Sequence, residues 1–227
     1  MARAGIARPL IPPAGETLSL ADQAFFAIRE LIVTLELAPG AVVNERELIE
    51  RLEIGRTPVR EALRRLAQEK LVEVYPRRGI FVTTVDVRDL ARLCEVRSVL
   101  EPEAARLAAE RATQLDLDAL GELLNELGSS KARDDKALID LDQRIHRTIY
   151  RCTHNHFLEA TLEEYYALAL RIWMLALEET GELQAAVLEH RALLEAVAFG
   201  KGDVAAQIMR DHVEHFESAM RRVLLAR

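Results

Sequence analysis

Between Leu20 and Val85 the spacing of the apolar residues changes from helical to strand-like, in an order of elements that few folds contain. Apolar residues at helical spacing predict a first helix from Leu20 to Leu35, and the turn signal Pro39-Gly40 follows it. Asn44 then predicts the start of a short second helix, with Glu47 three residues later as in a capping box. Two helices in quick succession therefore open this part of the chain.

A third helix and two strands complete the pattern. Gly55 breaks the second helix, Thr57 is expected to cap the third, and Pro58 is expected to take its first position, where a missing N–H costs nothing. β-Branched and aromatic residues then predict strands at Val72–Tyr75 and Ile80–Val85 around a tight turn. Helix, helix, turn, helix and a two-stranded wing together predict a winged helix-turn-helix over residues 18–85.

From residue 86 onward the patterns are helical only, which predicts a mainly α protein whose second domain, residues 86–227, is an all-helical bundle. Pro102 is expected to kink or interrupt the first of these helices. Residues 1–17, with three prolines after Arg8, are expected to form a flexible N-terminal arm. The expected helices span residues 87–111, 115–128, 135–152, 155–178, 182–199 and 203–225.

Several features favour a cytoplasmic protein with no membrane segment. No apolar run reaches the roughly 18 residues that a bilayer requires. Arg3 and Arg8 are not followed by the apolar stretch of a secretory signal. Cys94 and Cys152 lie within helical patterns and have no metal-ligand spacing, so a reducing compartment is the simpler interpretation.

The net charge of −7 argues at first against nucleic acid as a partner, but the distribution of charge reverses that conclusion. Residues 1–85 carry 12 basic and 11 acidic side chains, so the acidity belongs to the second domain. Between Arg56 and Arg78 basic residues outnumber acidic ones by 7 to 3. A local basic surface is what contact with phosphates requires, whatever the charge of the whole chain.

The polar face of the third predicted helix carries this basic character. Arg60 and Arg64 lie one turn apart on it, and Arg56 precedes the expected start of the helix. Arginines at such positions can pair with guanine edges in the major groove, while Thr57 and the first-turn amides can bind phosphate. Arg77 and Arg78 at the expected wing tip can reach a neighbouring groove. The alternative is a solvated helix face held by Arg–Glu pairs.

The stretch RTPVREALRRL followed by RRGIFV resembles the DNA-binding domain of the GntR family of bacterial regulators. Gly55 stands where the family usually has Ser or Thr, so one hydroxyl–phosphate contact is expected to be missing. Arg46 opens the second helix, and Gly79 lets the wing backbone approach the minor groove. By position, the resemblance implies DNA contacts from Arg46, Arg56, Thr57, Arg60 and Gly79.

Four residues of the second domain have the chemistry of metal ligands. Asp142 and His146 are four residues apart on one predicted helix, so they share a face, and His190 and His212 lie on two later helices. Three helices can bring one carboxylate and three imidazoles to one point inside a bundle. Such a set suits a first-row divalent ion with open positions. The alternative is that each histidine is an ordinary core or surface residue.

From about residue 86 to residue 215 the chain resembles the FCD domain, the effector domain of the FadR-type branch of the GntR family. The supporting runs are RSVLEPEAARLAA, LDQRIHRTIYRCTHNHFL and EHRALLEAV. The resemblance implies one divalent ion per chain, which could be zinc, nickel or manganese. His215, one turn beyond the last ligand, could be a decoy. The implied ligands are Asp142, His146, His190 and His212.

The same resemblance implies that the effector is a small organic acid. Its carboxylate could bind an open metal position and be clamped by an arginine. Arg97 and Arg171 are the candidates for this effector-binding role. The alternatives are a helix pair of Arg97 with Glu101 and a surface charge for Arg171.

These features together predict a ligand-responsive bacterial transcription regulator, a repressor and not an enzyme. A palindromic operator requires two recognition helices about 34 Å apart, so a homodimer is expected on double-stranded DNA. One alternative is a regulator for which the metal ion itself is the signal. Another is a metal-dependent hydrolase with a DNA-binding appendage, although the sequence offers no obvious general base near the ligands.

Overall fold

The computed structural model describes residues 18–129, 135–180 and 183–225. By its internal contacts the chain divides into two compact units, Met1–Val85 and Asp86–Arg227. The expected N-terminal arm, residues 1–17, lies outside the described residues. Within the described ranges no helix is both long and apolar enough to cross a lipid bilayer.

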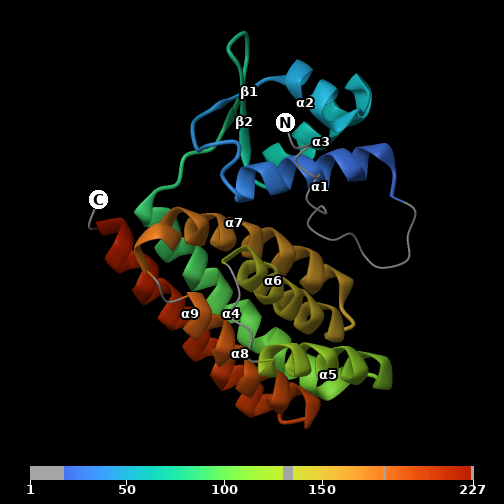
Figure 1. The fold of residues 1–227 in the computed structure, drawn as a ribbon, viewed down its shortest axis with the longest axis vertical. Helices are drawn as coiled ribbons and strands as arrows, with labels where there is room; N and C mark the ends of the chain where they lie inside the picture. Colours follow the sequence, from blue (N-terminus) through green and yellow to red (C-terminus); the bar gives the residue numbers. More distant parts are fainter. Residues whose placement is uncertain (1–17, 130–134, 181–182, 226–227) are drawn as a thin grey trace. The chain divides into compact units, whose positions relative to one another are not determined.

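Three helices form the framework of the N-terminal unit, as predicted (Figure 1). Ser19 caps α1 by accepting a hydrogen bond from the Asp22 amide, and Asn44 caps α2 through the amides of Arg46 and Glu47. Helix α1 packs against α3, and the core between them contains fully buried aliphatic side chains. The helices are α1 (Leu20–Val33), α2 (Glu45–Leu52) and α3 (Arg56–Gln68).

Helix α3 begins earlier than the sequence predicted. Its N-cap is Gly55, not Thr57, and the amide of Val59 donates to the Gly55 carbonyl at 3.3 Å. Pro58 is tolerated at the third helical position because the first amides of a helix have no helical acceptor in any case. Glycine provides no side-chain cap, so Thr57 becomes an exposed first-turn residue.

The wing is a three-stranded antiparallel sheet in the order β1-β3-β2, so the expectation of two strands is wrong. Strand β2 (Val72–Tyr75) is as predicted, and β3 (Gly79–Val82) is shorter than expected and begins one residue earlier. The additional strand, β1 (Val42–Val43), pairs Val42 with Phe81. Two residues are too few to show strand alternation, so only the pairing with β3 identifies this element.

The second unit is entirely helical in its described residues, and each predicted helix is present with its ends within two residues of expectation. Helix α4 contacts α6, α7, α8 and α9 and runs beside α9 in Figure 1. The helices are α4 (Val87–Arg111), α5 (Gln114–Gly128), α6 (Asp135–Cys152), α7 (His156–Thr180), α8 (Leu183–Ala198) and α9 (Gly202–Leu225).

Helix α4 continues through Pro102, so this proline does not interrupt it. Proline removes one backbone hydrogen bond from a helix interior, at a cost of about 3 kcal/mol. Pro102 is buried, and the small side chains of Ala104, Ala105 and Ala108 are also buried. Close packing of neighbouring helices against α4 offsets the missing hydrogen bond and keeps the helix intact.

We expect residues 86–227, expressed alone, to fold into a stable helical domain. The reason is that the helices surrounding α4 bury their own apolar core within this unit. Circular dichroism during thermal unfolding is the measurement, and a cooperative loss of helical signal is the expected result. A fragment without a cooperative transition would show that the bundle depends on residues 1–85.

Candidate nucleic-acid interface and candidate metal-binding cavity

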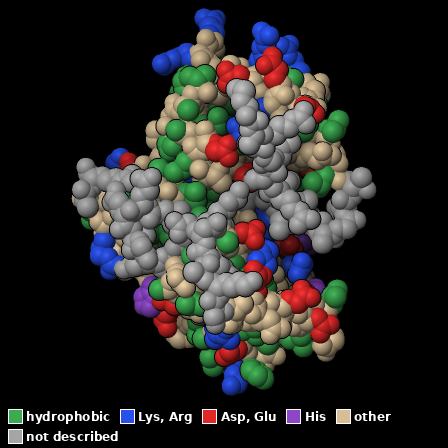
Figure 2. Space-filling view, in the orientation of Figure 1, with side chains coloured by type: hydrophobic (Ala, Val, Ile, Leu, Met, Phe, Trp, Pro, Cys, Tyr) green, Lys and Arg blue, Asp and Glu red, His purple; other side chains and the backbone are tan. Residues whose placement is uncertain are grey.

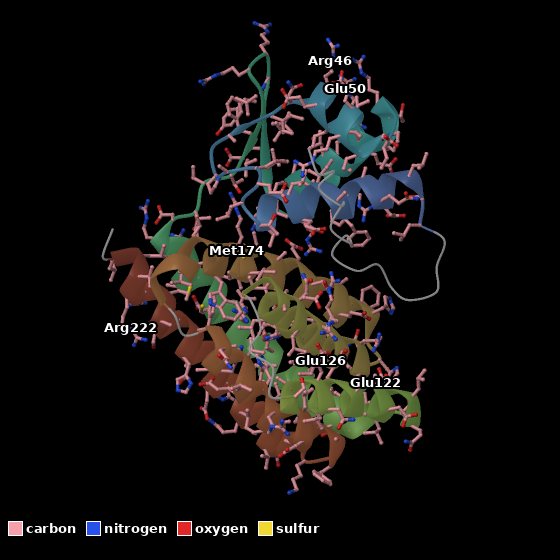
Figure 3. The ribbon with its side chains drawn as sticks, in the orientation of Figure 1. Arg46, Glu50, Glu122, Glu126, Met174 and Arg222 are labelled. Carbon is pink, nitrogen blue, oxygen red and sulfur yellow. The ribbon has the colours of Figure 1, made fainter. Side chains whose placement is uncertain are left out.

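All of the DNA-contacting candidates of the N-terminal unit are exposed. Arg46 is on α2 and its Nε lies 2.9 Å from Glu50 Oε1, with both side chains on the outer surface in Figure 3. Arg60 of α3 makes a similar pair with Glu45 of α2, at 2.8 Å. The exposed candidates are Arg46, Arg56, Thr57, Arg60, Arg64, Arg77, Arg78 and Gly79.

The Arg–Glu pairs agree in part with the alternative of a solvated helix face. Exposed ion pairs are worth only about 0–1 kcal/mol, because water and salt screen both charges. Arg46 and Arg60 can therefore exchange their glutamates for phosphate or base edges at small cost. Arg65 differs, because it bonds to Asp22 of α1 at 2.6 Å and lies over the Phe25 ring, which gives it a structural role.

The turn between β2 and β3 holds backbone conformations that favour glycine. Arg77 has φ of +64° and Gly79 has φ of +111°. A Cβ on Gly79 would meet no atom within 4 Å, so the backbone conformation and not space explains the glycine. In Figure 2 basic side chains project from this turn and from the end of the unit that contains α2.

Three histidines of the second unit converge as the sequence predicted. His146 of α6, His190 of α8 and His212 of α9 each offer a ring nitrogen, and these atoms lie within 4.8 Å of one another. The Nε2 atoms of His146 and His190 are 3.1 Å apart. His215 is 69% exposed and does not join this group, so His212 is the residue of α9 that does.

Asp142 lies on the same face of α6 as His146 and beside the three histidines, although it is not one of the three residues whose ligand atoms converge within 4.8 Å. Its Oδ2 accepts a hydrogen bond from the Tyr166 hydroxyl at 2.6 Å. Its Oδ1 is buried, has no hydrogen-bond partner within the described part of the chain, and lies 3.7 Å from His190 Nε2. A buried carboxylate oxygen without a donor is costly, and a cation at this point would remove that cost.

Hydrogen bonds at the far side of each ring orient two of the histidines. His190 Nδ1 lies 3.2 Å from the Val187 carbonyl, and His146 Nδ1 lies 3.1 Å from the Tyr150 hydroxyl and 3.5 Å from Glu101 Oε2. If both Nδ1 atoms carry the proton, two Nε2 lone pairs face each other at 3.1 Å. That arrangement suits a cation between them, so the donor set fits a divalent metal ion.

The electrostatics keep the ligand atoms available. Burial, reinforced by the neighbouring His212, lowers the pKa of His190 to about 3, so this ring is neutral at pH 7. Burial raises the pKa of Asp142, but the electrostatic interactions with the neighbouring imidazoles and the hydrogen bond from Tyr166 outweigh it and leave that pKa below its ordinary value. A neutral imidazole beside an ionised carboxylate is the protonation state that metal binding requires.

Of the two candidate effector arginines, the structure places only Arg97 at the cluster. Arg97 is buried, and its Nε bonds to Glu101 one turn along α4. Glu101 also approaches His146, and although burial raises its pKa, Arg97 and His146 hold that pKa well below the usual value. Arg97 Nη1 is buried and has no hydrogen-bond partner among the described residues. Arg171 is buried too, but it does not line the cavity beside the cluster.

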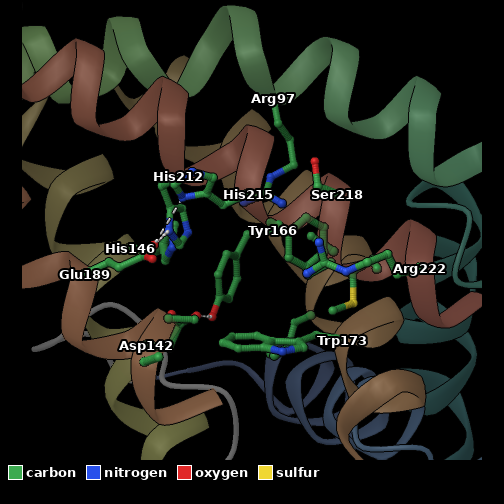
Figure 4. A pocket seen from close by; sticks show the side chains of 17 residues that line it. Arg97, Asp142, His146, Tyr166, Trp173, Glu189, His212, His215, Ser218 and Arg222 are labelled. Carbon is green, nitrogen blue, oxygen red and sulfur yellow. Dashed lines mark hydrogen bonds and ion pairs between the residues drawn. The ribbon is translucent and has the colours of Figure 1, made fainter. Parts of the chain in front are cut away.

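That cavity has a volume of about 360 Å³ and opens beside the histidines (Figure 4). Tyr166, Trp173 and Phe216 line it together with Arg97. The sequence did not single out Tyr166 or Phe216, since nothing in their local pattern distinguishes them from core residues. Only the packing of α7 and α9 around the cluster shows their place.

Two families of proteins match this chain. The family described as "Bacterial regulatory proteins, gntR family" matches residues 20–82, and the FCD domain matches residues 92–215. A transcriptional regulator of the helix-turn-helix type from Streptomyces ambofaciens is 34% identical over 193 residues, which is 83% of this chain and 80% of the relative. The galactonate operon transcriptional repressor of Escherichia coli K12 is 30% identical over 215 residues, 84% of this chain and 92% of that protein.

Solved structures share the fold. E. coli McbR/YncC superposes with a TM-score of 0.75 at 24% identity, covering 91% of this chain and 99% of that one. The metal-free FCD domain of TM0439 superposes with a TM-score of 0.52 at 18% identity, covering 63% of this chain and 99% of that domain. The curated relatives named above are regulators and not enzymes, so the hydrolase alternative has no support among them.

Acidification should destabilise the metal-free protein through His190. Its folded pKa is about 3 and its unfolded pKa about 6.5, so between these values the unfolded chain binds a proton that the folded chain does not. Stability should therefore fall as the pH drops below 6.5, by on the order of 2 kcal/mol at pH 5. Urea unfolding of chelator-treated wild type and His190→Gln at pH 7 and pH 5 measures this. Equal losses in the two proteins would remove His190 as the source.

Proposed function

Because the chain belongs to the GntR family of DNA-binding transcription regulators and carries an FCD domain, we propose that it is a repressor controlled by a small carboxylate bound beside a divalent metal ion. One observation carries the proposal. Three imidazoles converge, and two of them, His146 and His212, line one cavity together with Asp142 and Arg97, whose Oδ1 and Nη1 atoms are buried without a hydrogen-bond partner in the described structure. Such a set is suited to a cation and an anion together.

In this proposal Asp142, His146, His190 and His212 hold one divalent ion per chain. Zinc, nickel and manganese all accept nitrogen and carboxylate ligands, so the donor set does not choose between them. When bound, the ion would offer a positively charged coordination site to an effector oxygen. A solved FCD domain is described as its metal-free form, which agrees with a metal in domains of this kind.

Arg97 is the proposed clamp for the effector carboxylate, in preference to Arg171. Glu101 engages Arg97 through Nε and leaves Nη1 as a buried spare donor. A carboxylate that accepts from Nη1 would satisfy this donor with a charge-assisted hydrogen bond. Because Glu101 also lies 3.5 Å from His146 Nδ1, one carboxylate positions both the clamp and a metal ligand.

On the DNA side, α3 is the proposed recognition helix and the wing the second contact. A palindromic operator would be bound by a homodimer, since two recognition helices are needed about one turn of DNA apart. The galactonate operon relative is named a repressor, which supports that direction of control. The proposed contacts are Arg46, Arg56, Thr57, Arg60, Arg64, Arg77, Arg78 and Gly79.

A regulator for which the metal ion itself is the signal is the second candidate. The cluster alone would suffice for that function. The cavity of about 360 Å³ beside it and the spare donor of Arg97 favour an organic effector instead.

Arg60→Ala should weaken operator binding by about 1–3 kcal/mol, because an arginine on the exposed face of the first turns of α3 can pair with a base edge. Binding at fixed salt to an operator selected from random DNA and to scrambled DNA is the measurement. Arg51→Ala is the matched control, since Arg51 is also exposed and paired with a glutamate but is not a proposed contact. An equal loss on both DNAs would make Arg60 a phosphate contact.

Metal analysis of the purified protein should find one divalent ion per chain in wild type and in His215→Ala, and none in His212→Ala. The two histidines lie one turn apart on α9, but only His212 joins the cluster. Occupancy should decrease as the pH is lowered, because a protonated imidazole cannot bind metal.

Full occupancy in His212→Ala would remove His212 from the site. A wild-type protein that takes up no zinc, nickel or manganese would contradict the metal and leave a cavity with an arginine clamp alone.

A further inference from the structure

The cavity beside the histidine cluster has a large apolar part. Leu170 and Trp173 of α7 and Met220 of α9 line it and are at most 8% exposed. Phe216 of α9 meets Trp173 edge to face, with ring centroids 6.5 Å apart. Figure 4 shows His146 and His212 at one end of the cavity and Trp173 towards the other.

The buried polar groups that line the cavity already have roles. Asp142, His146 and His212 belong to the proposed metal site, and the Tyr166 hydroxyl donates to Asp142. Arg97 keeps a single spare donor, Nη1. Apart from the Trp173 indole, the remaining polar lining side chains that the structure describes are exposed, and therefore belong to the cavity mouth: Glu189, His215, Ser218 and Arg222.

This distribution of polar and apolar lining residues predicts different affinities for two kinds of organic acid. A polyhydroxylated acid would place several hydroxyl groups against Leu170, Trp173 and Met220, where the Trp173 indole N–H is the one side-chain hydrogen-bonding group among these three residues. Each buried hydroxyl without a partner costs about a factor of ten in affinity or more. An apolar body loses no hydrogen bond there and gains the hydrophobic transfer.

Size and shape favour a ring. A cavity of roughly 150 Å³ is enough to hold benzene, so about 360 Å³ accommodates a ring, a short linker and a carboxylate. The Arg97 guanidinium lies 4.9 Å from the Phe216 ring centroid. Phe216 thus connects the anion clamp with the aromatic wall, so a short ligand can reach both.

We propose that the effector is a monocarboxylate with an apolar, ring-sized body. Its carboxylate accepts from Arg97 Nη1 at the metal end, and its ring packs against Trp173 and Phe216. The proposal rests on the proposed function in that it takes this cavity as the effector site. This effector class differs from that of any regulator whose effector is a sugar acid.

Isothermal titration calorimetry of the zinc-loaded full chain, with phenylacetate and galactonate as probes, tests the inference. Phenylacetate should bind at least about tenfold more tightly than galactonate. Phenylacetamide, which keeps the ring and lacks the charge, should bind more weakly than phenylacetate. Ala219→Leu places a larger side chain in the cavity wall and should weaken phenylacetate binding at least tenfold, while zinc binding stays unchanged.

Ala206→Leu is the matched control, because Ala206 is on α9 outside this cavity, and its phenylacetate affinity should equal that of wild type. If Ala219→Leu fails to fold, Trp173→Leu takes its place and should also weaken phenylacetate binding, because it removes a ring against which the ligand packs. Tighter binding of galactonate, or no binding of phenylacetate, overturns the apolar effector and leaves the carboxylate proposal to other acids. Equal binding of phenylacetate and phenylacetamide contradicts the carboxylate clamp of the proposed function, while the apolar class survives.

Discussion

The burial of charged side chains inside the helical unit determines which contacts the residues around the cavity must make. Arg97, Glu101 and Asp142 are almost completely withdrawn from water. An isolated ion in such a place costs several kcal/mol, so each needs partners from neighbouring helices. Glu101 meets this need for Arg97 and approaches His146, which ties α4 to α6 through one carboxylate. Arg97 Nη1 and Asp142 Oδ1, which belong to residues lining the cavity, are buried without a hydrogen-bond partner in the described structure, and so is Glu101 Oε2 behind them.

The lack of hydrogen-bond partners for these buried atoms points to a function, because buried polar groups normally have partners. A bundle selected only for stability could hold apolar residues at these positions at no loss, since buried ion pairs are often replaceable by hydrophobic packing. An unsatisfied donor and an unsatisfied acceptor at one cavity therefore support the proposal of two ligands of opposite charge. Metal and effector would each stabilise the folded unit by binding it in preference to the unfolded chain.

The two units rely on different electrostatics. On the proposed DNA-contacting surface Arg46 and Arg60 make exposed pairs with Glu50 and Glu45, which water weakens and DNA phosphates could replace. Beside the cavity the Arg97–Glu101 pair is buried and its geometry is held by packing. Reversible contact with a polyanion needs the first kind of charge, and selective recognition of a small ligand needs the second.

The sequence by itself determined the order of the elements and much of the candidate site. Helical periodicity located the helices, and Asn44 marked the start of α2. The spacing of Asp142 and His146 placed both on one face of α6. These features could be predicted because hydrogen bonding within a helix and side-chain periodicity depend on residues that are close in sequence. It misplaced the cap of α3 at Thr57, since Gly55 gives no side-chain signal. Strand β1 was missed because two residues carry no period and the partner strand is far along the chain.

Only the tertiary structure decided which groups meet. Arg97 and Arg171 look alike as helical arginines, yet packing brings Arg97 to the cavity and leaves Arg171 away from it. Tyr166 reaches Asp142 across 24 positions of sequence, and His212 rather than His215 joins the cluster because of the rotation of α9. These outcomes depend on how the helices rotate and pack against α4. Contacts between segments far apart in the sequence determine that packing, so no single local pattern predicts it.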